Sequence, residues 1–502
     1  MRELTGFSEA VLADALAPEQ AWARLCATMT EQRPMPAAIH FARFELTFLR
    51  DFCERFQPDT AFPIDAVCVH AIACRLYPDL PRRNLRALAG FLGHGLHLER
   101  RSLGHVLATA FIWRKLAAEL SARGIGSWAE LGTWLAAKEK PATPRKRTYP
   151  LPRERCRALP DEPGVYRFLR SNGDVLYVGK ATSLKKRVTS HFSKQRGATE
   201  RALEMLTQVS DIAVTVSASP LEAALLETDL IKSLNPPYNV QLVQGERGAW
   251  FASVELDSAA TTPDERHRLG PLPSRFSVRC LRALCELLEG EAPTVQRRAA
   301  VVGAPLAFAP DETSFAEGFA AFRERHALRL SEQRGSARAR AFAIARTLLL
   351  SAAPEDAEGQ SEAEEAAELD APVWDAARVC RHLERSAAAA YQVLRRASWL
   401  CLLAESVVTF REPRARVGRS LVLQGARVVE LADQGADEVV SLGPRRRRGA
   451  SREAFDAARY DELRILTTEL KRILRDGGEV AVRLSARRVL SGSRLASLLR
   501  LV

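Results

Sequence analysis

Apolar positions recur at helical spacing through most of the N-terminal part of the chain. Over residues 1–137 this pattern predicts a helix-rich α/β unit, with one alternating run, PAAIHF at 36–41, that is typical of a strand. Residues 163–243 predict the order strand, turn, strand, helix, helix, strand, helix. The segments 419–431 and 479–485 alternate as strands do within a mostly helical C-terminal part. The pattern therefore predicts an α/β or α+β protein with several domains.

Composition agrees with a multidomain chain that meets a polyanion. A length of 502 residues exceeds what one hydrophobic core usually supports, so about two to four domains are expected. The excess of 12 positive charges favours nucleic acid as a partner. No apolar stretch approaches the roughly 18 residues of a membrane span, and the charged N-terminus lacks the apolar core of a signal peptide. We expect a cytoplasmic protein without a membrane partner.

Two segments of biased composition divide the chain. Residues 138–159 are rich in proline and basic residues and predict a linker, and the acidic residues 351–373 predict a disordered linker. The predicted domains are therefore 1–137, 160–243, a mainly helical 244–350, and 374–502, whose role is unknown. The basic linker either contacts phosphates or is a solvated connector. Candidate DNA contacts are Arg145, Lys146 and Arg147 in this linker, and Lys185 and Lys186.

A hairpin is predicted at VYRFLRSNGDVLYVG, where two strand-like runs flank the Asn-Gly pair at 172–173 that type I′ turns prefer. It places Tyr166 and Tyr177 on adjacent strands near the same end. Gly164 and Gly179 would let a backbone or a phosphate approach closely. Tyrosines are also common cross-strand partners, so the hairpin alone leaves a purely structural interpretation open.

A helix is predicted to follow the hairpin, with Thr182 or Ser183 as its N-cap. Arg187 and His191 are four residues apart and would lie side by side at the border of its apolar face. Lys180 comes just before this helix. The pattern therefore brings basic side chains towards the two tyrosines.

A carboxylate interrupts the apolar face of a later predicted helix. In SPLEAALLETDLIKSLNPPYN, residues 219–239, Glu227 falls in the middle of the apolar arc, whereas Glu222 and Asp229 fall on the polar side. Burying a lone carboxylate is costly, so Glu227 should be paired, protonated or bound to a metal. From the residues alone, a structural ion pair and a functional ligand are both open.

These segments together resemble the GIY-YIG nuclease family, and within it the N-terminal catalytic domain of UvrC and its shorter relative Cho. GVY and YVG stand for the two name-giving tripeptides, followed by GKATSLKKRVTSHF and LEAALLETDLIKSLNPPYN, and LGPLPSR at 269–275 is similar to the stretch after this domain in UvrC-like proteins. The resemblance implies a three-stranded antiparallel sheet flanked by helices. It implies an active site lined by Tyr166, Tyr177, Lys180, Arg187, His191, Glu227 and Asn239.

The resemblance also implies the chemistry. Glu227 would hold one divalent ion, Mg²⁺ or Mn²⁺, Arg187 would bind phosphate oxygens, and Tyr166 or Tyr177 would act as the base. His191 stands where UvrC proteins can carry Tyr. The expected substrate is damaged or distorted double-stranded DNA, nicked on one strand in nucleotide excision repair, with damage-recognition proteins as partners.

Residues 300–502 show no match to the second nuclease domain of UvrC, so one incision per encounter is expected, as in Cho.

Two other functions stay open as alternatives. A non-catalytic DNA-binding or scaffold protein is disfavoured by the complete motif set at 164–239. A GIY-YIG enzyme of restriction or recombination type is disfavoured by LIKSLNPPYN and GPLPSR.

The N-terminal region resembles, more faintly, the exonuclease family of the DNA polymerase III epsilon subunit, an RNase H-like fold whose first motif would precede Met1. IHFARFELTFL and RRSLGHVLATA are similar to its second and third motifs. Glu45 stands where Asp is expected, Arg100 replaces the general-base His, and His105 replaces a metal-binding Asp. We therefore expect an inactive region kept for docking or DNA binding. A metal site is disfavoured by the spacing of the histidines His70, His94, His97 and His105.

Overall fold

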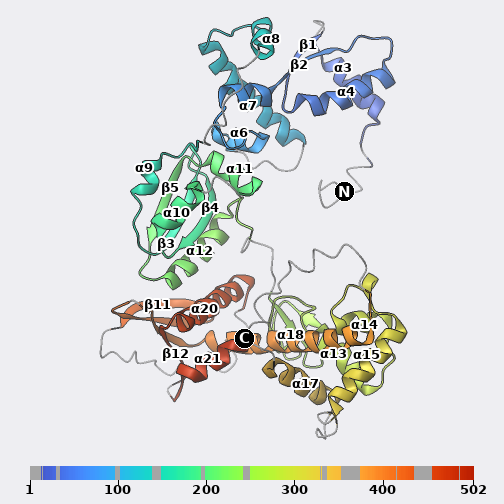
Figure 1. Cartoon of the computed structure of the whole chain (residues 1–502), viewed down its shortest axis with the longest axis vertical. Coiled ribbons are helices and arrows are strands. Elements are labelled where there is room, and N and C mark those ends of the chain that lie inside the picture. Colours follow the sequence, from blue (N-terminus) through green and yellow to red (C-terminus); the bar gives the residue numbers. More distant parts are fainter. Residues whose placement is uncertain are drawn as a thin grey trace. The chain divides into compact units, whose positions relative to one another are not determined.

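The computed structural model divides the chain into two units, residues 1–240 and 241–502 (Figure 1). The structure describes residues 13, 15–29, 34–95, 102–137, 148–193, 198–240, 249–327, 330, 336–351, 373–413, 415–434, 455–485 and 487–502. Arg145, Lys146 and Arg147 lie outside these ranges, as do residues 352–372 of the acidic segment. No described helix combines the length and the apolar character that crossing a membrane requires.

The N-terminal part of the first unit packs helices around a two-stranded parallel sheet. Strand β1 (Met35–Ile39) pairs with β2 (Ile64–Cys68), which confirms the strand predicted at PAAIHF. Apolar residues of α5, α6 and α7 form the core, and side chains of Asn84 and Ser127 cap α6 and α8. The exonuclease fold expected for this region stays a prediction. The helices are α3 (Pro18–Thr28), α4 (Ala42–Phe56), α5 (Val69–Leu76), α6 (Leu85–Phe91), α7 (Ser102–Ala122) and α8 (Trp128–Ala136).

The rest of the first unit contains the predicted three-stranded antiparallel sheet, in the order β4-β3-β5. Helices α10 and α12 both pack against β3 and β4. Tyr166, Phe168 and Leu176 from the strands are fully buried together with residues of α10 and α11. The elements are α9 (Arg153–Arg157), β3 (Gly164–Leu169), β4 (Val175–Ala181), α10 (Leu184–Ser193), α11 (Glu200–Gln208), β5 (Asp211–Val216) and α12 (Pro220–Leu234).

The hairpin of β3 and β4 is confirmed, but its turn differs from the predicted type I′. A type I′ turn needs two residues with positive φ, and here Gly173 alone has one, +87°. The Gly173 N–H donates to Arg170 O, and the Arg170 N–H donates to Asp174 O, both at 3.0 Å. Asn172 instead accepts the Asp174 N–H with its side-chain oxygen at 3.1 Å. The result is a three-residue loop that ends on a left-handed glycine.

The second half of the predicted basic linker is folded. Residues Arg153–Arg157 form the short helix α9, and Leu151 and Cys156 are buried in the same core as Tyr166. The Arg155 Nε donates to Asp211 Oδ1 at 3.0 Å, which ties this segment to β5. Apolar residues spaced among the basic ones anchor the segment, and a composition dominated by proline and arginine concealed them.

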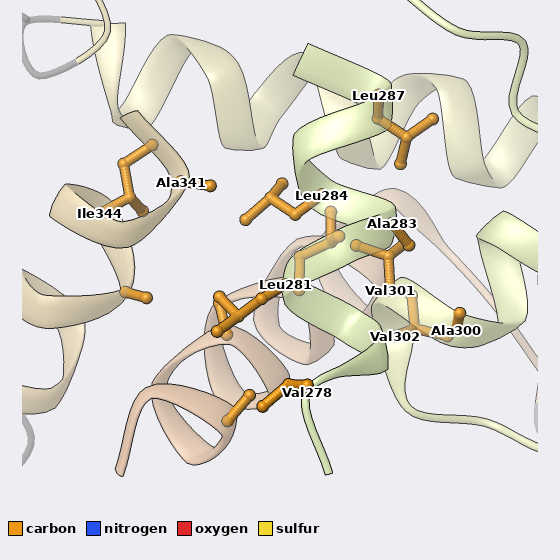
Figure 2. Close-up of a cluster of buried hydrophobic side chains, with 14 of the residues drawn as sticks. Val278, Leu281, Ala283, Leu284, Leu287, Ala300, Val301, Val302, Ala341 and Ile344 are labelled. Atoms are coloured by element: carbon orange, nitrogen blue, oxygen red, sulfur yellow. The ribbon is translucent and has the colours of Figure 1, made fainter. Parts of the chain in front are cut away.

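The second unit begins with a small antiparallel sheet, order β7-β6-β8, and continues as a helical bundle. Figure 2 shows its core, where Leu281, Leu284 and Leu287 of α13 pack with Val301 and Ile344. Mostly helical structure was expected here. The elements are β6 (Trp250–Ala252), β7 (Ala259–Ala260), β8 (Leu269–Leu272), α13 (Arg279–Glu289), α14 (Val295–Val302), η1 (Leu306–Phe308), α15 (Glu312–Arg325), α17 (Ala337–Ser351) and α18 (Ala376–Leu403).

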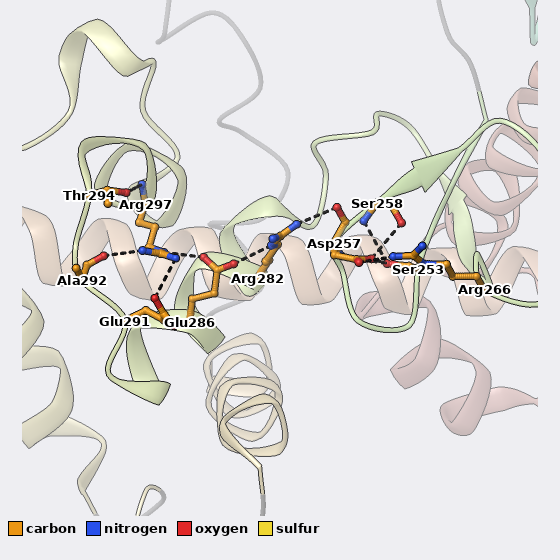
Figure 3. A network of polar contacts seen from close by, with 10 residues as sticks. All are labelled: Ser253, Asp257, Ser258, Arg266, Arg282, Glu286, Glu291, Ala292, Thr294 and Arg297. Carbon is orange, nitrogen blue, oxygen red and sulfur yellow. Dashed lines mark hydrogen bonds and ion pairs between the residues drawn. The ribbon is translucent and has the colours of Figure 1, made fainter.

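A polar network joins α13 to the loop that precedes β8 (Figure 3). Glu286 accepts hydrogen bonds from Arg282 Nε at 2.9 Å and from Arg297 Nε at 2.8 Å. The Arg282 Nη1 donates to Asp257 O at 2.8 Å, and Arg266 forms an ion pair with the Asp257 carboxylate. The segment LGPLPSR starts on β8, which packs against α18 of the bundle.

The C-terminal strands predicted from the sequence are confirmed, and they belong to a five-stranded antiparallel sheet, order β11-β10-β9-β12-β13. The segment 419–431 is a hairpin and not one strand. Its turn residues Gly425 and Ala426 have φ of +56° and +63°, so the type I′ geometry occurs here. The elements are β9 (Val407–Arg411), β10 (Gly418–Gln424), β11 (Arg427–Gln434), α20 (Ala457–Arg475), β12 (Glu479–Ser485), β13 (Arg488–Ser491) and α21 (Gly492–Arg500).

Candidate active site

Two tyrosines form the centre of the site. Tyr166 on β3 pairs with Gly179 on β4, and Phe168 pairs with Tyr177, so both tyrosines lie on one face of the sheet. The centroids of their rings lie 6.1 Å apart. A Cβ atom on Gly179 would lie 2.5 Å from the Tyr166 Oη. This glycine therefore makes room for a tyrosine ring, whereas the sequence had suggested an approaching backbone or phosphate.

Helix α10 brings a histidine to the tyrosines. Ser183 is its N-cap, because the Ser183 Oγ accepts the Lys186 N–H at 3.2 Å. The Tyr166 Oη and the His191 Nε2 lie 2.8 Å apart, within hydrogen-bond distance, and the imidazole tautomer decides which of them donates. The His191 ring centroid also lies 6.3 Å from that of Tyr177. The structure thus brings three of the predicted site residues together.

The predicted carboxylate lies near the end of β4. Ala223 and Ile231, four residues before and four residues after Glu227, are buried, and Glu227 lies between them on the same face of α12, half-buried. Leu234, at the end of this helix, is 43% exposed, so part of the predicted apolar arc is not covered. The Glu227 Oε1 accepts the backbone N–H of Lys180 at 2.9 Å. The carboxylate is therefore fixed to the strand that carries Tyr177.

Burial raises the pKa of both phenols. For Tyr166 burial is the largest cause, and the neighbouring Tyr177 adds to it. For Tyr177 burial is followed by the negative charge of Glu227. The exposed Arg187 acts in the opposite direction and lowers the pKa of both tyrosines. Each phenol is therefore protonated at neutral pH in the protein alone, so a tyrosine that acts as a base needs a proton acceptor or added positive charge.

The side chain of Asn239 is hydrogen-bonded to the backbone of strand β4. Its side-chain Oδ1 accepts the Val178 N–H at 3.0 Å, and its Nδ2 donates to the Val178 O at 2.9 Å. One amide thus satisfies both backbone groups of the residue between Tyr177 and Gly179. Asn239, which was predicted to line the active site, therefore fixes the backbone of the strand that carries Tyr177.

The neighbours of Asn239 were not singled out from the sequence. Tyr238 is buried and donates its phenol proton to Glu204 Oε1 at 2.6 Å, and Gln208 Nε2 donates to the Tyr238 Oη at 2.6 Å. The signal that could have found them is the helix stop at Asn235, a left-handed C-cap followed by two prolines. A tyrosine directly after such a stop is positioned by the end of the helix.

The remaining predicted DNA contacts differ in environment. Lys185 and Lys186 are exposed on the first turn of α10, beside Arg187, and the Lys186 Nζ lies 3.7 Å from an Asp161 carboxylate oxygen. They can therefore reach a phosphate from solvent. The linker residues 145–147 lie outside the described part of the chain.

Two of the residues predicted to be degenerate in the N-terminal region, Glu45 and His105, line a cavity of about 1690 Å³. Glu45 on α4 and His105 on α7 are exposed and line it with His40 and His70, whereas Arg100 and His97 lie outside the described residues. Both ring nitrogens of His40 are buried without a hydrogen-bond partner. Within the described ranges, no three or more His, Cys, Asp or Glu side chains gather as metal ligands.

Curated proteins are similar to part of this chain. UvrABC system protein C from Legionella pneumophila (strain Lens) is 45% identical over 130 residues, 24% of this chain and 21% of that protein. The same protein from Nitrosomonas europaea is 54% identical over 82 residues, 16% of this chain and 13% of the relative. The alignment thus spans about a fifth of the length of the first of these relatives.

A solved structure and a family model also match part of this chain. The magnesium-bound crystal structure of the GIY-YIG N-terminal endonuclease domain of UvrC from Thermotoga maritima is 35% identical, covers 18% of this chain and 94% of that chain, and has a TM-score of 0.16. The family model that matches is the UvrC-like GIY-YIG domain, over residues 162–240. The tyrosines, His191, Glu227 and Asn239 therefore all lie within the segment that matches the UvrC-like GIY-YIG domain.

Proposed function

We propose that the chain is a metal-dependent DNA endonuclease that nicks one strand of damaged or distorted double-stranded DNA, once per encounter as in Cho. It would act in nucleotide excision repair with damage-recognition proteins. The observation that carries this proposal is the Tyr166 phenol 2.8 Å from His191, on the same small sheet whose β4 backbone fixes the Glu227 carboxylate. The match of residues 162–240 to the UvrC-like domain supports it.

The residues of the site fit a divalent ion held largely by water and substrate. Mg²⁺ keeps several water ligands and is commonly bound through one or two carboxylates and the substrate phosphates. Glu227 supplies one half-buried carboxylate, and the described residues contain no larger ligand cluster. Mn²⁺ accepts the same oxygen ligands. When bound, the ion would stabilise the negative charge that develops on the scissile phosphate.

The protein's own side chains would move the proton. If the neutral imidazole of His191 accepts at Nε2, the Tyr166 phenol can pass its proton to His191 as it takes one from the attacking water. Burial raises the pKa of Tyr166 and opposes the phenolate, so this acceptor offsets the cost of burial. Arg187 would bind a phosphate oxygen through its planar guanidinium.

A nicking assay with the full chain on duplex DNA that carries a bulky lesion, in Mg²⁺ or Mn²⁺, tests the proposal. Glu227→Gln keeps an oxygen that can accept the Lys180 N–H but removes the charge, so we expect a rate loss of at least about 10²-fold with nearly unchanged DNA affinity and melting temperature. Asp229→Asn, on the exposed side of the same helix, is the matched control and should nick like wild type. Near-normal cleavage by Glu227→Gln would contradict the metal-ligand assignment.

A further inference from the structure

Residues 79–95 of the N-terminal region, which we call the brace, pack directly on the nuclease domain. Helix α6 of the brace lies against α11, and Gly90 approaches so closely that an added Cβ would lie 1.9 Å from the Gln208 Oε1. At the C-terminal end of the brace, a Cβ on Gly95 would lie 2.9 Å from the Asn172 Nδ2 in the β3–β4 turn. The brace is therefore in close contact with both α11 and the β3–β4 turn.

Polar groups cross this contact in a chain. The Asn84 Nδ2 donates to Glu204 Oε2 at 2.6 Å, and the Arg82 N–H donates to the Thr207 Oγ1 at 3.2 Å. Arg86 adds an ion pair with Glu204 at 3.8 Å. Every one of these acceptors lies on α11, so the brace fixes the side of that helix on which Glu204 lies.

The same glutamate continues the chain into the nuclease core. The Glu204 Oε1 accepts the Tyr238 phenol proton at 2.6 Å. Gln208 donates to the same phenol through its Nε2, and the Gln208 Oε1 accepts from Arg170 Nη2 at 2.9 Å. Gln208 and Tyr238 are 1% and 5% exposed, so their polar atoms depend on these partners. A buried polar group that loses its partner costs about 1–3 kcal/mol. The network is therefore expected to hold together or to rearrange as a whole.

Tyr238 precedes Asn239, the residue that clamps Val178. The backbone N–H of Tyr238 also donates to the Leu176 O at 3.1 Å, so two consecutive residues hold β4 at alternate positions. Tyr177, whose ring belongs to the site, lies between these two residues of β4. The path from Asn84 to the site is thus continuous: brace, Glu204, Tyr238, Asn239, β4.

We propose that the brace is a positioning element of the nuclease: by fixing Glu204 it sets Tyr238 and Asn239, and so places β4 with Tyr177 and the Lys180 amide that holds Glu227. Only the predicted effect on the nicking rate rests on the proposed endonuclease function. The N-terminal region then acts on catalysis through packing, without chemistry of its own. A misplacement of about 1 Å in catalytic groups is enough to cost about 10²-fold in rate.

The test uses the full chain and three variants. Gly90→Val should push α6 off Gln208, Glu204→Ala removes both acceptor oxygens, and Glu204→Gln keeps one oxygen, which can accept from Asn84 or from Tyr238 in the wild-type geometry but not from both. Hydrogen exchange at the Val178 amide, which is bonded to Asn239, reports β4, with amides of β5 at the other edge of the sheet as reference. Single-turnover nicking at saturating DNA reports the site, and a separate titration reports DNA affinity.

We expect Gly90→Val and Glu204→Ala to raise exchange at Val178 relative to β5 by at least tenfold, and to lower the single-turnover rate by at least tenfold at unchanged DNA affinity. Glu204→Gln, which keeps one of the two acceptor oxygens, should lie between Glu204→Ala and wild type in both readouts. The proposal would be overturned if hydrogen exchange at Val178 and the nicking rate stayed at wild-type levels in the first two variants. It would also be overturned if hydrogen exchange rose equally in β5 and β4. If the wild-type chain does not nick, the function proposal fails, and the exchange readout still decides whether the brace holds β4.

Discussion

Replacing Gly179 with alanine adds one methyl group at the closest packed point of the site. The new Cβ would lie 2.5 Å from the Tyr166 Oη, 2.6 Å from its Cζ and 2.8 Å from the Tyr177 Cε1, whereas ordinary contacts begin at 3.4 Å. Each ring must therefore move by up to about 1 Å. Tyr166 is fully buried and cannot swing into solvent. Overpacking of this kind costs about 1–3 kcal/mol of the free energy of unfolding.

The rate should fall further than stability does. A shift of about 1 Å in a positioned catalytic group costs about 10²-fold in rate, so we expect that loss in single-turnover nicking at saturating DNA and metal. Gly132→Ala is the control, since Gly132 is exposed in α8 with no atom within 4 Å of the added Cβ. This substitution should raise the free energy of unfolding by up to about 1 kcal/mol, because alanine favours a helix more than glycine does. Wild-type nicking by a folded Gly179→Ala protein would refute the role assigned to tyrosine placement.

Two further predictions concern acid stability and DNA affinity. Burial, followed by repulsion from His70, lowers the pKa of His40 to about 4 from 6.5, so its contribution to the free energy of unfolding is complete above pH 6.5 and is lost as the pH falls towards 4. His40→Leu should flatten the fall in melting temperature over that range, and an unchanged slope would exclude His40 as the cause. Replacing Arg145, Lys146 and Arg147 by alanine should reduce the log-log salt slope of DNA affinity by roughly 1 to 3 units, and an unchanged slope would make the segment a solvated connector.

The parts of the site that the sequence predicted well obey local rules. Ser183 caps α10 because a side-chain oxygen two or three residues before a free N–H is the strongest signal of a helix start. The β3–β4 hairpin follows from two β-prone runs around Asn-Gly. The spacing of Tyr166 and Tyr177 then places both on one face, since strand side chains alternate. The three-stranded antiparallel sheet came from the resemblance, and its order β4-β3-β5 came from the structure, since local rules supply neither.

The errors arise where a local pattern depends on what lies opposite. The apolar arc of α12 includes Leu234, but Leu234 is 43% exposed, because only the part of an arc that other elements cover is buried. The Asn-Gly pair at 172–173 fits type I′ geometry, yet the Asn172 side chain bonds the Asp174 amide and favours a longer loop. Leu151 and Cys156 were assigned to a linker because their burial depends on β3 and α10 and not on their own neighbours.

Asn84 shows how one residue can be half predictable. Its Oδ1 accepts the Ala87 N–H at 3.0 Å as the N-cap of α6, a role that an asparagine before an apolar run indicates from sequence alone. Its Nδ2 donates to Glu204, 120 residues along the chain, and no local pattern contains that contact. The cap fixes the side chain, so its amide group is already oriented when α11 packs against it. A helix-capping residue in a region without predicted chemistry therefore becomes the first link between that region and the strand that carries Tyr177.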